Sequence, residues 1–160
     1  MRNVMTLKTF IGKYPLRIFH QLLQIYWFLF RPKKMGAKVV VICNDNILLV
    51  KHTFNPSYWT LPGGGVKRGE EPINAARREL KEEIGRNVDN LEFLRIVHNK
   101  SQYKEDTIYT YYTKFEDKNI IKDDLEILEA RWFPVNQLPE VNPVLRTTLL
   151  YAIKYARKSA

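Results

Sequence analysis

The most informative segment of the chain is GGGVKRGEEPINAARRELKEEIG, residues 63–85. Pro72 suits the first position of a helix and Gly85 suits the position after its last residue, so the segment predicts a helix over residues 72–84. Four apolar side chains recur along this helix at spacings of three and four residues, which places them on one buried face. They are Ile73, Ala76, Leu80 and Ile84.

Three carboxylates occupy a different flank of the same helix. Glu79, Glu82 and Glu83 stand at positions i, i+3 and i+4, so they lie together. Neighbouring carboxylates repel one another, and a divalent cation would neutralise them; all-oxygen ligands favour Mg²⁺ or Mn²⁺ over zinc. A solvated acidic face is the alternative. The glycines of residues 63–65 favour metal binding, because backbone without Cβ atoms can approach a metal or a phosphate closely.

Together, the glycines and the carboxylates resemble the signature of the Nudix hydrolase family, G-x5-E-x7-R-E-U-x-E-E-x-G-U, in which U is a bulky aliphatic residue. The positions that match are Gly64, Glu70, Arg78, Glu79, Leu80, Glu82, Glu83 and Gly85. At the last position Arg86 replaces the aliphatic residue, which affects the packing of the helix end. Segments 48–65 and 129–139 are also similar to the family, so the resemblance covers residues 37–157.

The resemblance implies a fold, a cofactor and a reaction. The fold would be α/β, a Nudix-type α/β/α sandwich with a mixed central sheet. The reaction would be hydrolysis of a nucleoside diphosphate linked to another group, and Mg²⁺ or Mn²⁺ would serve as the cofactor. The implied metal ligands are Glu79, Glu82, Glu83 and the carbonyl group of Gly63.

The resemblance also assigns roles to other residues of the motif. Glu82 or Glu79 would take the proton from the attacking water. Arg78 and Glu70 would form an ion pair that orients the carboxylate helix. Gly64, Glu70 and Gly85 would be the structural positions of the motif.

Further candidate site residues lie outside the motif. The family often uses another acid from a late strand, here Glu126 or Glu129, and we expect Glu129 because it opens the run EARWF. Lys51 and His52 are candidates to meet phosphate, with a plain surface role as the alternative. Tyr58 is a candidate to shape the pocket or stack on a base, whereas Trp59 is expected in the core.

The rest of the chain after residue 36 predicts short strands and a final helix. Strands are expected at 37–43, 47–53, 91–98, 107–115 and 126–133, with a loop at 54–58. Asn142 and Pro143 predict the start of a helix that runs to about residue 158. Cys43 is the one cysteine, which excludes an internal disulfide and four-cysteine zinc sites. It is expected to be an inert core residue.

The basic charge belongs to the N-terminal segment. The chain has 26 Lys and Arg against 17 Asp and Glu, yet residues 1–38 contain eight of the bases and no acid. This pattern argues against nucleic acid as a partner of the whole protein and favours a local anionic partner. We therefore expect an N-terminal basic, amphipathic helical extension over residues 1–35, followed by the hydrolase domain over 36–160.

The extension centres on residues 15–30, whose polar side chains recur at helical spacing. The hypotheses are a helix that packs on its own domain or on a second copy in a homodimer, and a helix that lies in the plane of an anionic membrane. Its uninterrupted apolar run, residues 25–30, is far shorter than the ~20 residues that span a bilayer. A cytoplasmic location is expected, with the inner face of a membrane as the alternative.

The leading substrate hypothesis is a nucleoside triphosphate or a related nucleotide. No proline follows the motif before Pro134, unlike in family members that act on ADP-ribose, and the NADH-type signature SQPWPFP is missing. Tyr103 lies near the tyrosine position of dinucleoside polyphosphate hydrolases. Dinucleoside polyphosphates, nucleotide sugars and RNA 5′ ends remain alternatives, as does a non-catalytic nucleotide sensor.

Overall fold

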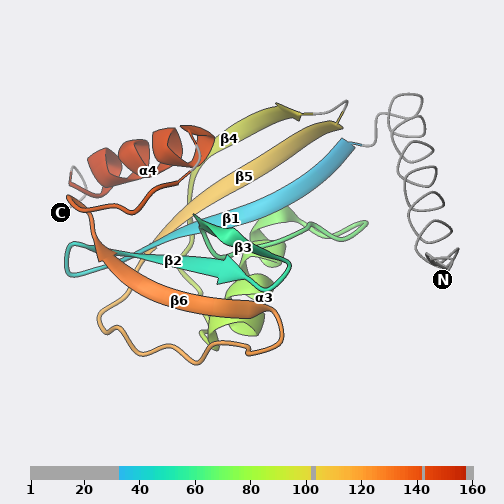
Figure 1. The fold of residues 1–160 in the computed structure, drawn as a ribbon. Helices are drawn as coiled ribbons and strands as arrows, with labels where there is room; N and C mark the ends of the chain where they lie inside the picture. Colours follow the sequence, from blue (N-terminus) through green and yellow to red (C-terminus); the bar gives the residue numbers. More distant parts are fainter. Residues whose placement is uncertain (1–32, 102–103, 142, 158–160) are drawn as a thin grey trace, which may run out of the picture.

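The computed structural model describes residues 33–101, 104–141 and 143–157. Six strands and two helices follow one another along this part of the chain (Figure 1). They are β1 (Lys33–Cys43), β2 (Asn46–His52), β3 (Asn55–Thr60), α3 (Pro72–Ile84), β4 (Glu92–Ser101), β5 (Lys104–Lys114), β6 (Ile127–Pro134) and α4 (Pro143–Ala156).

The sheet is mixed, with the order β3-β2-β1-β5-β4 and with β6 paired to β2. β1 and β5 are parallel, whereas the other pairs are antiparallel. β1 pairs with β2 only beside their tight turn, at Ile42↔Ile47 and Cys43↔Asn46. Asn44 and Asp45 form this turn with φ values of 44° and 58°, as two-residue hairpin turns require.

The glycine-rich segment fills the gap that opens where β1 leaves β2. Its backbone follows β1: the N–H of Ala37 donates to the carbonyl of Gly64 over 2.9 Å, and the N–H of Val66 donates to the carbonyl of Met35 over 2.9 Å. Gly36 and Gly65 form an antiparallel bridge between them. The segment that precedes α3 is thereby held against the central strand of the sheet.

The two helices cover opposite faces of the sheet. Successive residues of β1 alternate between these faces, so that Val39 packs in the core beneath α3 and Val40 packs in the core beneath α4. Residues Ala75, Ala76, Leu80 and Ile84 of α3 line the first core, and residues Leu145, Leu149 and Ala152 of α4 line the second. The predicted mixed α/β fold is confirmed. The predicted N-terminal helix lies outside the described residues.

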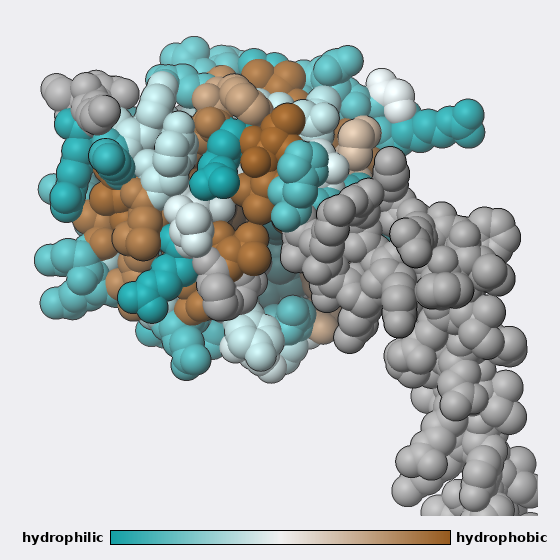
Figure 2. Space-filling model, turned by 90° about the horizontal axis from the view of Figure 1, so that it is seen from above, coloured by the Kyte–Doolittle hydropathy of each residue, from teal (hydrophilic) through white to brown (hydrophobic). Residues whose placement is uncertain are grey.

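The outer surface around α4 is not uniformly polar. Seen from above, hydrophobic residues lie in patches between hydrophilic ones (Figure 2). Val144, Leu150 and Tyr151 of α4 are among the exposed large hydrophobic residues of the described chain. Scattered exposure of this kind is ordinary on a protein surface.

The ends of α3 follow the sequence signals. Pro72 is its first residue, and Gly85 ends it with a φ of 68° and an N–H that donates to the carbonyl of Lys81 over 3.1 Å. The predicted helix over residues 72–84 is confirmed. Arg86, at the position that differs from the motif, lies over the ring of Phe115 at 4.7 Å and pairs with Asp117 at 3.1 Å.

Several boundaries differ from the sequence prediction by one to three residues, and two differences are larger. The expected loop at residues 54–58 is largely strand β3, which pairs with β2 at Val50↔Thr60 and His52↔Asn55. Its first four residues are exposed, so it shows no alternating hydrophobic pattern that sequence reasoning could detect. β1 begins at Lys33, inside the expected extension, because it continues to pair with β5 there.

Candidate active site

The glycine segment brings backbone directly against the carboxylates of α3. Gly63 has a φ of 123°, and its N–H donates to Glu83 Oε2 over 2.8 Å. A Cβ at Gly63 would lie 2.2 Å from the carbonyl oxygen of Ala37, and a Cβ at Gly64 would lie 2.6 Å from the carboxylate of Glu79. A side chain at Gly63 would therefore push the segment away from β1, whereas a side chain at Gly64 would displace the carboxylate of Glu79.

The three carboxylates of α3 do not share one environment. Glu79 is 8% exposed and Glu83 is 1% exposed, and both line a pocket, whereas the side chain of Glu82 is 49% exposed. Among the residues that the structure describes, no three His, Cys, Asp or Glu side chains are grouped closely enough to hold a metal ion as they stand. Two of the three expected carboxylate ligands thus meet at the glycine segment, and the third faces outward.

Arg78 explains the position of Glu82. Its guanidinium donates to Glu70 through Nε and Nη2, over 2.9 and 3.0 Å, and Nη1 reaches Glu79 at 2.7 Å and Glu82 at 3.0 Å. It also donates to the carbonyl of Gly65 over 3.0 Å. The hydrogen bonds that Arg78 donates to Glu70, together with one from the N–H of Lys67, lower the pKa of Glu70 to about 2. Arg78 therefore ties α3 to the glycine segment.

Lys38 is a site residue that our sequence analysis missed. Its ammonium donates to the carbonyl of Leu61 over 3.0 Å and to the carbonyl of Gly63. Burial lowers the pKa of Lys38, and the carboxylates of Glu83 and Glu79 oppose this effect. The signal was present in the sequence, since one charged residue interrupts the apolar strand AKVVVIC.

His52 lies beside Glu83 at the end of β2. It is 8% exposed, its ring stacks on Phe54 with a centroid distance of 4.9 Å, and its Nδ1 is 3.7 Å from Glu83 Oε1. Burial, assisted by the charge of Lys38, lowers the pKa of His52 to about 4. Burial raises the pKa of Glu83 to about 7. The imidazole is therefore neutral at physiological pH.

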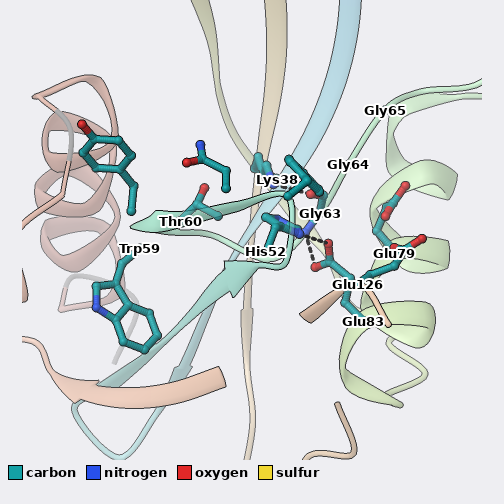
Figure 3. Close-up of a pocket in the computed structure, with 13 residues that line it drawn as sticks. Lys38, His52, Trp59, Thr60, Gly63, Gly64, Gly65, Glu79, Glu83 and Glu126 are labelled. Atoms are coloured by element: carbon teal, nitrogen blue, oxygen red, sulfur yellow. Dashed lines mark hydrogen bonds and ion pairs between the residues drawn. The ribbon is translucent and has the colours of Figure 1, made fainter. Parts of the chain in front are cut away.

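These residues surround a pocket of about 670 Å³ (Figure 3). Lys38, His52, Glu79 and Glu83 converge around the glycine segment, and Trp59 extends from β3 on another side. The pocket is also lined by Phe54 and Tyr58, which are 81% and 55% exposed. The site thus combines buried charge with accessible aromatic rings. The expected core position of Trp59 is confirmed, with 9% exposure and an edge contact to Phe133 at 4.8 Å.

Not all of the expected residues reach this pocket. Glu126 lines it, whereas Glu129, which we expected there, pairs with Lys51 at 3.6 Å and with Arg131. The reason is the register: β6 places Glu129 opposite Lys51, and an irregularity follows between Lys51 and His52. Lys51 and Glu129 are therefore absent from the described residues that line the pocket, and Tyr103 lies outside the described residues.

The donor set fits a hard divalent cation. Glu79 and Glu83 supply carboxylate oxygens, and the carbonyl of Gly63, which accepts from Lys38 in this structure, could join them once that ammonium moves away. Arg78 already pairs with Glu79 and Glu82, so a metal ion would compete with that guanidinium. The residues thus fit the expected cofactor by chemistry, and Glu82 would have to turn inward to join them.

A mixed sheet between two helices, with a glycine segment held against a carboxylate-bearing helix, defines an α/β/α domain of the Nudix type. The family model described as the NUDIX domain matches residues 32–151, and the chain belongs to this family.

Individual relatives share the domain at low identity. The chain is 29% identical over 106 residues to the NAD-capped RNA hydrolase NudC of Escherichia coli, a match that covers 66% of this chain and 40% of NudC. The chain thus spans less than half the length of the curated relatives it matches.

Solved structures show the same fold. The MutT NUDIX hydrolase from Burkholderia pseudomallei superposes with a TM-score of 0.68 and 22% identity, covering 75% of this chain and 98% of that protein. A C. elegans Ap4A hydrolase superposes with a TM-score of 0.69 and 18% identity, covering 78% and 98% of the two chains. At these identities the likeness concerns the fold.

Proposed function

We propose that this protein is a metal-dependent hydrolase that cleaves a phosphoanhydride bond in a nucleoside diphosphate linked to another group. The substrate is a nucleoside triphosphate or a related nucleotide. The observation that carries the proposal is the meeting of Glu79, Glu83 and the glycine segment inside one pocket. Two buried carboxylates beside a glycine backbone that carries no Cβ atoms suit a cation that binds phosphate oxygens.

Each residue of the site has a place in this reaction. Glu79, Glu82, Glu83 and the Gly63 carbonyl would hold Mg²⁺ or Mn²⁺, which when bound stabilises the developing charge and lowers the pKa of water. Glu79 or Glu82 accepts the proton of the attacking water. Arg78 keeps α3 aligned with the glycine segment. Glu126 is the acid outside the motif that supports the site from the pocket wall.

Binding of the nucleotide uses a positive charge and the aromatic rings at the pocket. Lys38 is the cationic side chain among the described residues that line the pocket, so it is placed to meet a phosphate oxygen. Tyr58 and Phe54 are exposed at the same pocket and supply faces on which a base can stack. A triphosphate contacts both regions at once, which supports it as the substrate.

The chemistry of named relatives does not transfer directly. NudC is named as an NAD-capped RNA hydrolase, but this chain lacks the NADH-type signature SQPWPFP. A purely sensing role gives no account of the full set of motif carboxylates, Glu79, Glu82 and Glu83, which a metal-dependent reaction uses. Hydrolysis of free nucleotides therefore remains the leading proposal.

The test is release of phosphate or pyrophosphate from a nucleotide panel with Mg²⁺ or Mn²⁺. The panel contains nucleoside triphosphates, oxidised nucleotides, dinucleoside polyphosphates, ADP-ribose, nucleotide sugars and RNA with a 5′ triphosphate. Glu83→Gln and Glu82→Gln should each lower turnover at least about 100-fold, because ligand shells control metal affinity and activity. Glu71→Gln, an exposed change at the start of α3, should stay within about twofold. Nucleotide binding without turnover under any metal would contradict the proposal.

A second proposal concerns the basic residues before β1. Five bases and no acid in residues 1–32 support contact with an anionic membrane surface, while packing on a second copy is the competing outcome. None of the helices in the described part of the chain is long and apolar enough to cross a membrane. Cosedimentation of the full chain with anionic vesicles at low salt, lost on deleting residues 1–32, is the expected result. Absence of vesicle binding combined with a dimer in solution would favour the competing outcome.

A further inference from the structure

His52 is a buried side chain whose Nδ1 has no hydrogen-bond partner in the described part of the chain. The residue is 8% exposed, and Nδ1 itself is fully buried. The ring is held in place because it stacks on Phe54 and because His52 pairs through the backbone with both β3 and β6. A fixed and buried polar atom without a partner is rare, since desolvation costs stability.

The unpartnered nitrogen is directed at the carboxylate of Glu83. His52 Nδ1 lies 3.7 Å from Glu83 Oε1, while Oε2 of the same carboxylate accepts the N–H of Gly63 over 2.8 Å. A hydrogen bond between nitrogen and oxygen spans about 2.7–3.2 Å, so the pair is too far apart for one. Two ligands that each lie about 2.1 Å from one metal ion are separated by about 3–4 Å, depending on their angle. The observed separation of 3.7 Å between the two atoms fits two ligands of one metal ion.

The chemistry of an imidazole supports ligation rather than phosphate binding. A neutral imidazole offers a lone pair and carries no positive charge for an anionic substrate. Lys38 is the group that provides charge at the same pocket. Imidazole nitrogen binds transition-metal ions readily, whereas Mg²⁺ prefers oxygen ligands and retains its water.

We propose that Nδ1 of His52 and Oε1 of Glu83 bind one divalent transition-metal ion, so that the site selects Mn²⁺ over Mg²⁺. This inference rests on the proposed hydrolase function and specifies its metal. Ligation through Nδ1 requires the tautomer with its proton on Nε2. Glu79 lies in the same pocket but would have to turn toward the ion to add a second carboxylate, because no three such side chains of the described residues stand close enough to share one ion. Substrate phosphate and water would fill the remaining positions.

The test is electron spin echo spectroscopy of the full-length protein loaded with Mn²⁺, which detects nitrogen bonded to the ion. The wild type should show histidine nitrogen coupling, and H52Q should lose it. H98Q is the matched control, because His98 is an exposed histidine of β4 whose Nδ1 lies 3.4 Å from the hydroxyl of Thr107. H52Q should also weaken Mn²⁺ binding at least about tenfold and change Mg²⁺ binding far less.

A second variant leaves the site itself intact. The chain has three histidines, so a H20Q/H98Q protein retains only His52, and nitrogen coupling should persist in it. Absence of coupling in this protein, or coupling that survives in H52Q, would overturn the inference. If a water molecule, rather than a metal ion, bridges His52 and Glu83, the nitrogen coupling will be absent, and this result also overturns the inference. Metal-dependent hydrolysis without nitrogen coupling would refute the metal assignment alone, whereas absence of hydrolysis with every metal would refute the proposed function.

Discussion

The three consecutive glycines provide a graded test of the site, because alanine meets a different obstacle at each position. At Gly63 a Cβ would lie 2.2 Å from the carbonyl oxygen of Ala37, on a backbone with a φ of 123°. Backbone strain of about 1–3 kcal/mol and displacement of packed neighbours by about 1–3 kcal/mol add to roughly 4 kcal/mol. Gly63→Ala should therefore lower Tm by about 12 °C, at about 3 °C per kcal/mol.

The next two positions should separate activity from stability. At Gly64 the Cβ would lie 2.6 Å from the carboxylate of Glu79, which is the far end of a flexible side chain and can rotate away. Gly64→Ala should thus lose about 1 kcal/mol of stability but at least about 100-fold in turnover, because Glu79 is displaced. At Gly65 a Cβ would meet no atom within 4 Å, so Gly65→Ala should be close to wild type in both properties.

The assay combines thermal unfolding, followed by circular dichroism, with metal-dependent release of pyrophosphate by all three variants. The reasoning fails if Gly63→Ala is as stable as the wild type. It fails equally if Gly64→Ala keeps the wild-type rate, since the close contact between the glycine segment and Glu79 would then have no role. A loss at Gly65 as large as at Gly64 would show that glycine flexibility, rather than space, is what matters.

Three further predictions concern side chains. Arg78→Lys keeps the charge but lacks the planar fork of donors that reaches Glu70, Glu79 and Glu82 together, so kcat should fall about 10–100-fold, and kinetics on the folded variant would check this. The pKa of Glu83, raised from 4.5 to about 7, makes the folded state lose stability as pH rises through that range, whereas the pKa of His52, lowered from 6.5 to about 4, makes it lose stability as pH falls. The two effects on the free energy of unfolding oppose each other in the wild type, and H52Q removes the contribution of His52. In H52Q without metal, the free energy of unfolding should therefore drop by about 3 kcal/mol between pH 4.5 and 7; a flat profile in urea titrations would refute this. Glu126→Gln should lower turnover more than Glu129→Gln, because Glu126 lines the pocket and Glu129 pairs with Lys51; the reverse order in matched kinetics would contradict the assignment.

The features that the sequence alone determined are those that depend on neighbouring residues. Pro72 and Gly85 set the limits of α3 because both act through local backbone geometry. The spacing of Glu79 and Glu83 predicted that both side chains lie on one flank of the helix, because helical periodicity fixes which residues share a face. The same local rules led to the Nudix resemblance, since the signature lies within one continuous segment, and the family match over residues 32–151 agrees with it.

The features that only the tertiary structure decided depend on contacts between distant segments. Lys38 and His52 belong to β1 and β2, and they meet Glu83 only because the sheet and the glycine segment bring these elements together. Glu126 rather than Glu129 lines the pocket, and the pairing of β2 with β6 sets Glu129 opposite Lys51 instead. Strand register and burial arise from long-range pairing, in which a shift of one residue exchanges the faces of a strand. For this reason a local pattern predicts the carboxylate helix but not the residues that surround it.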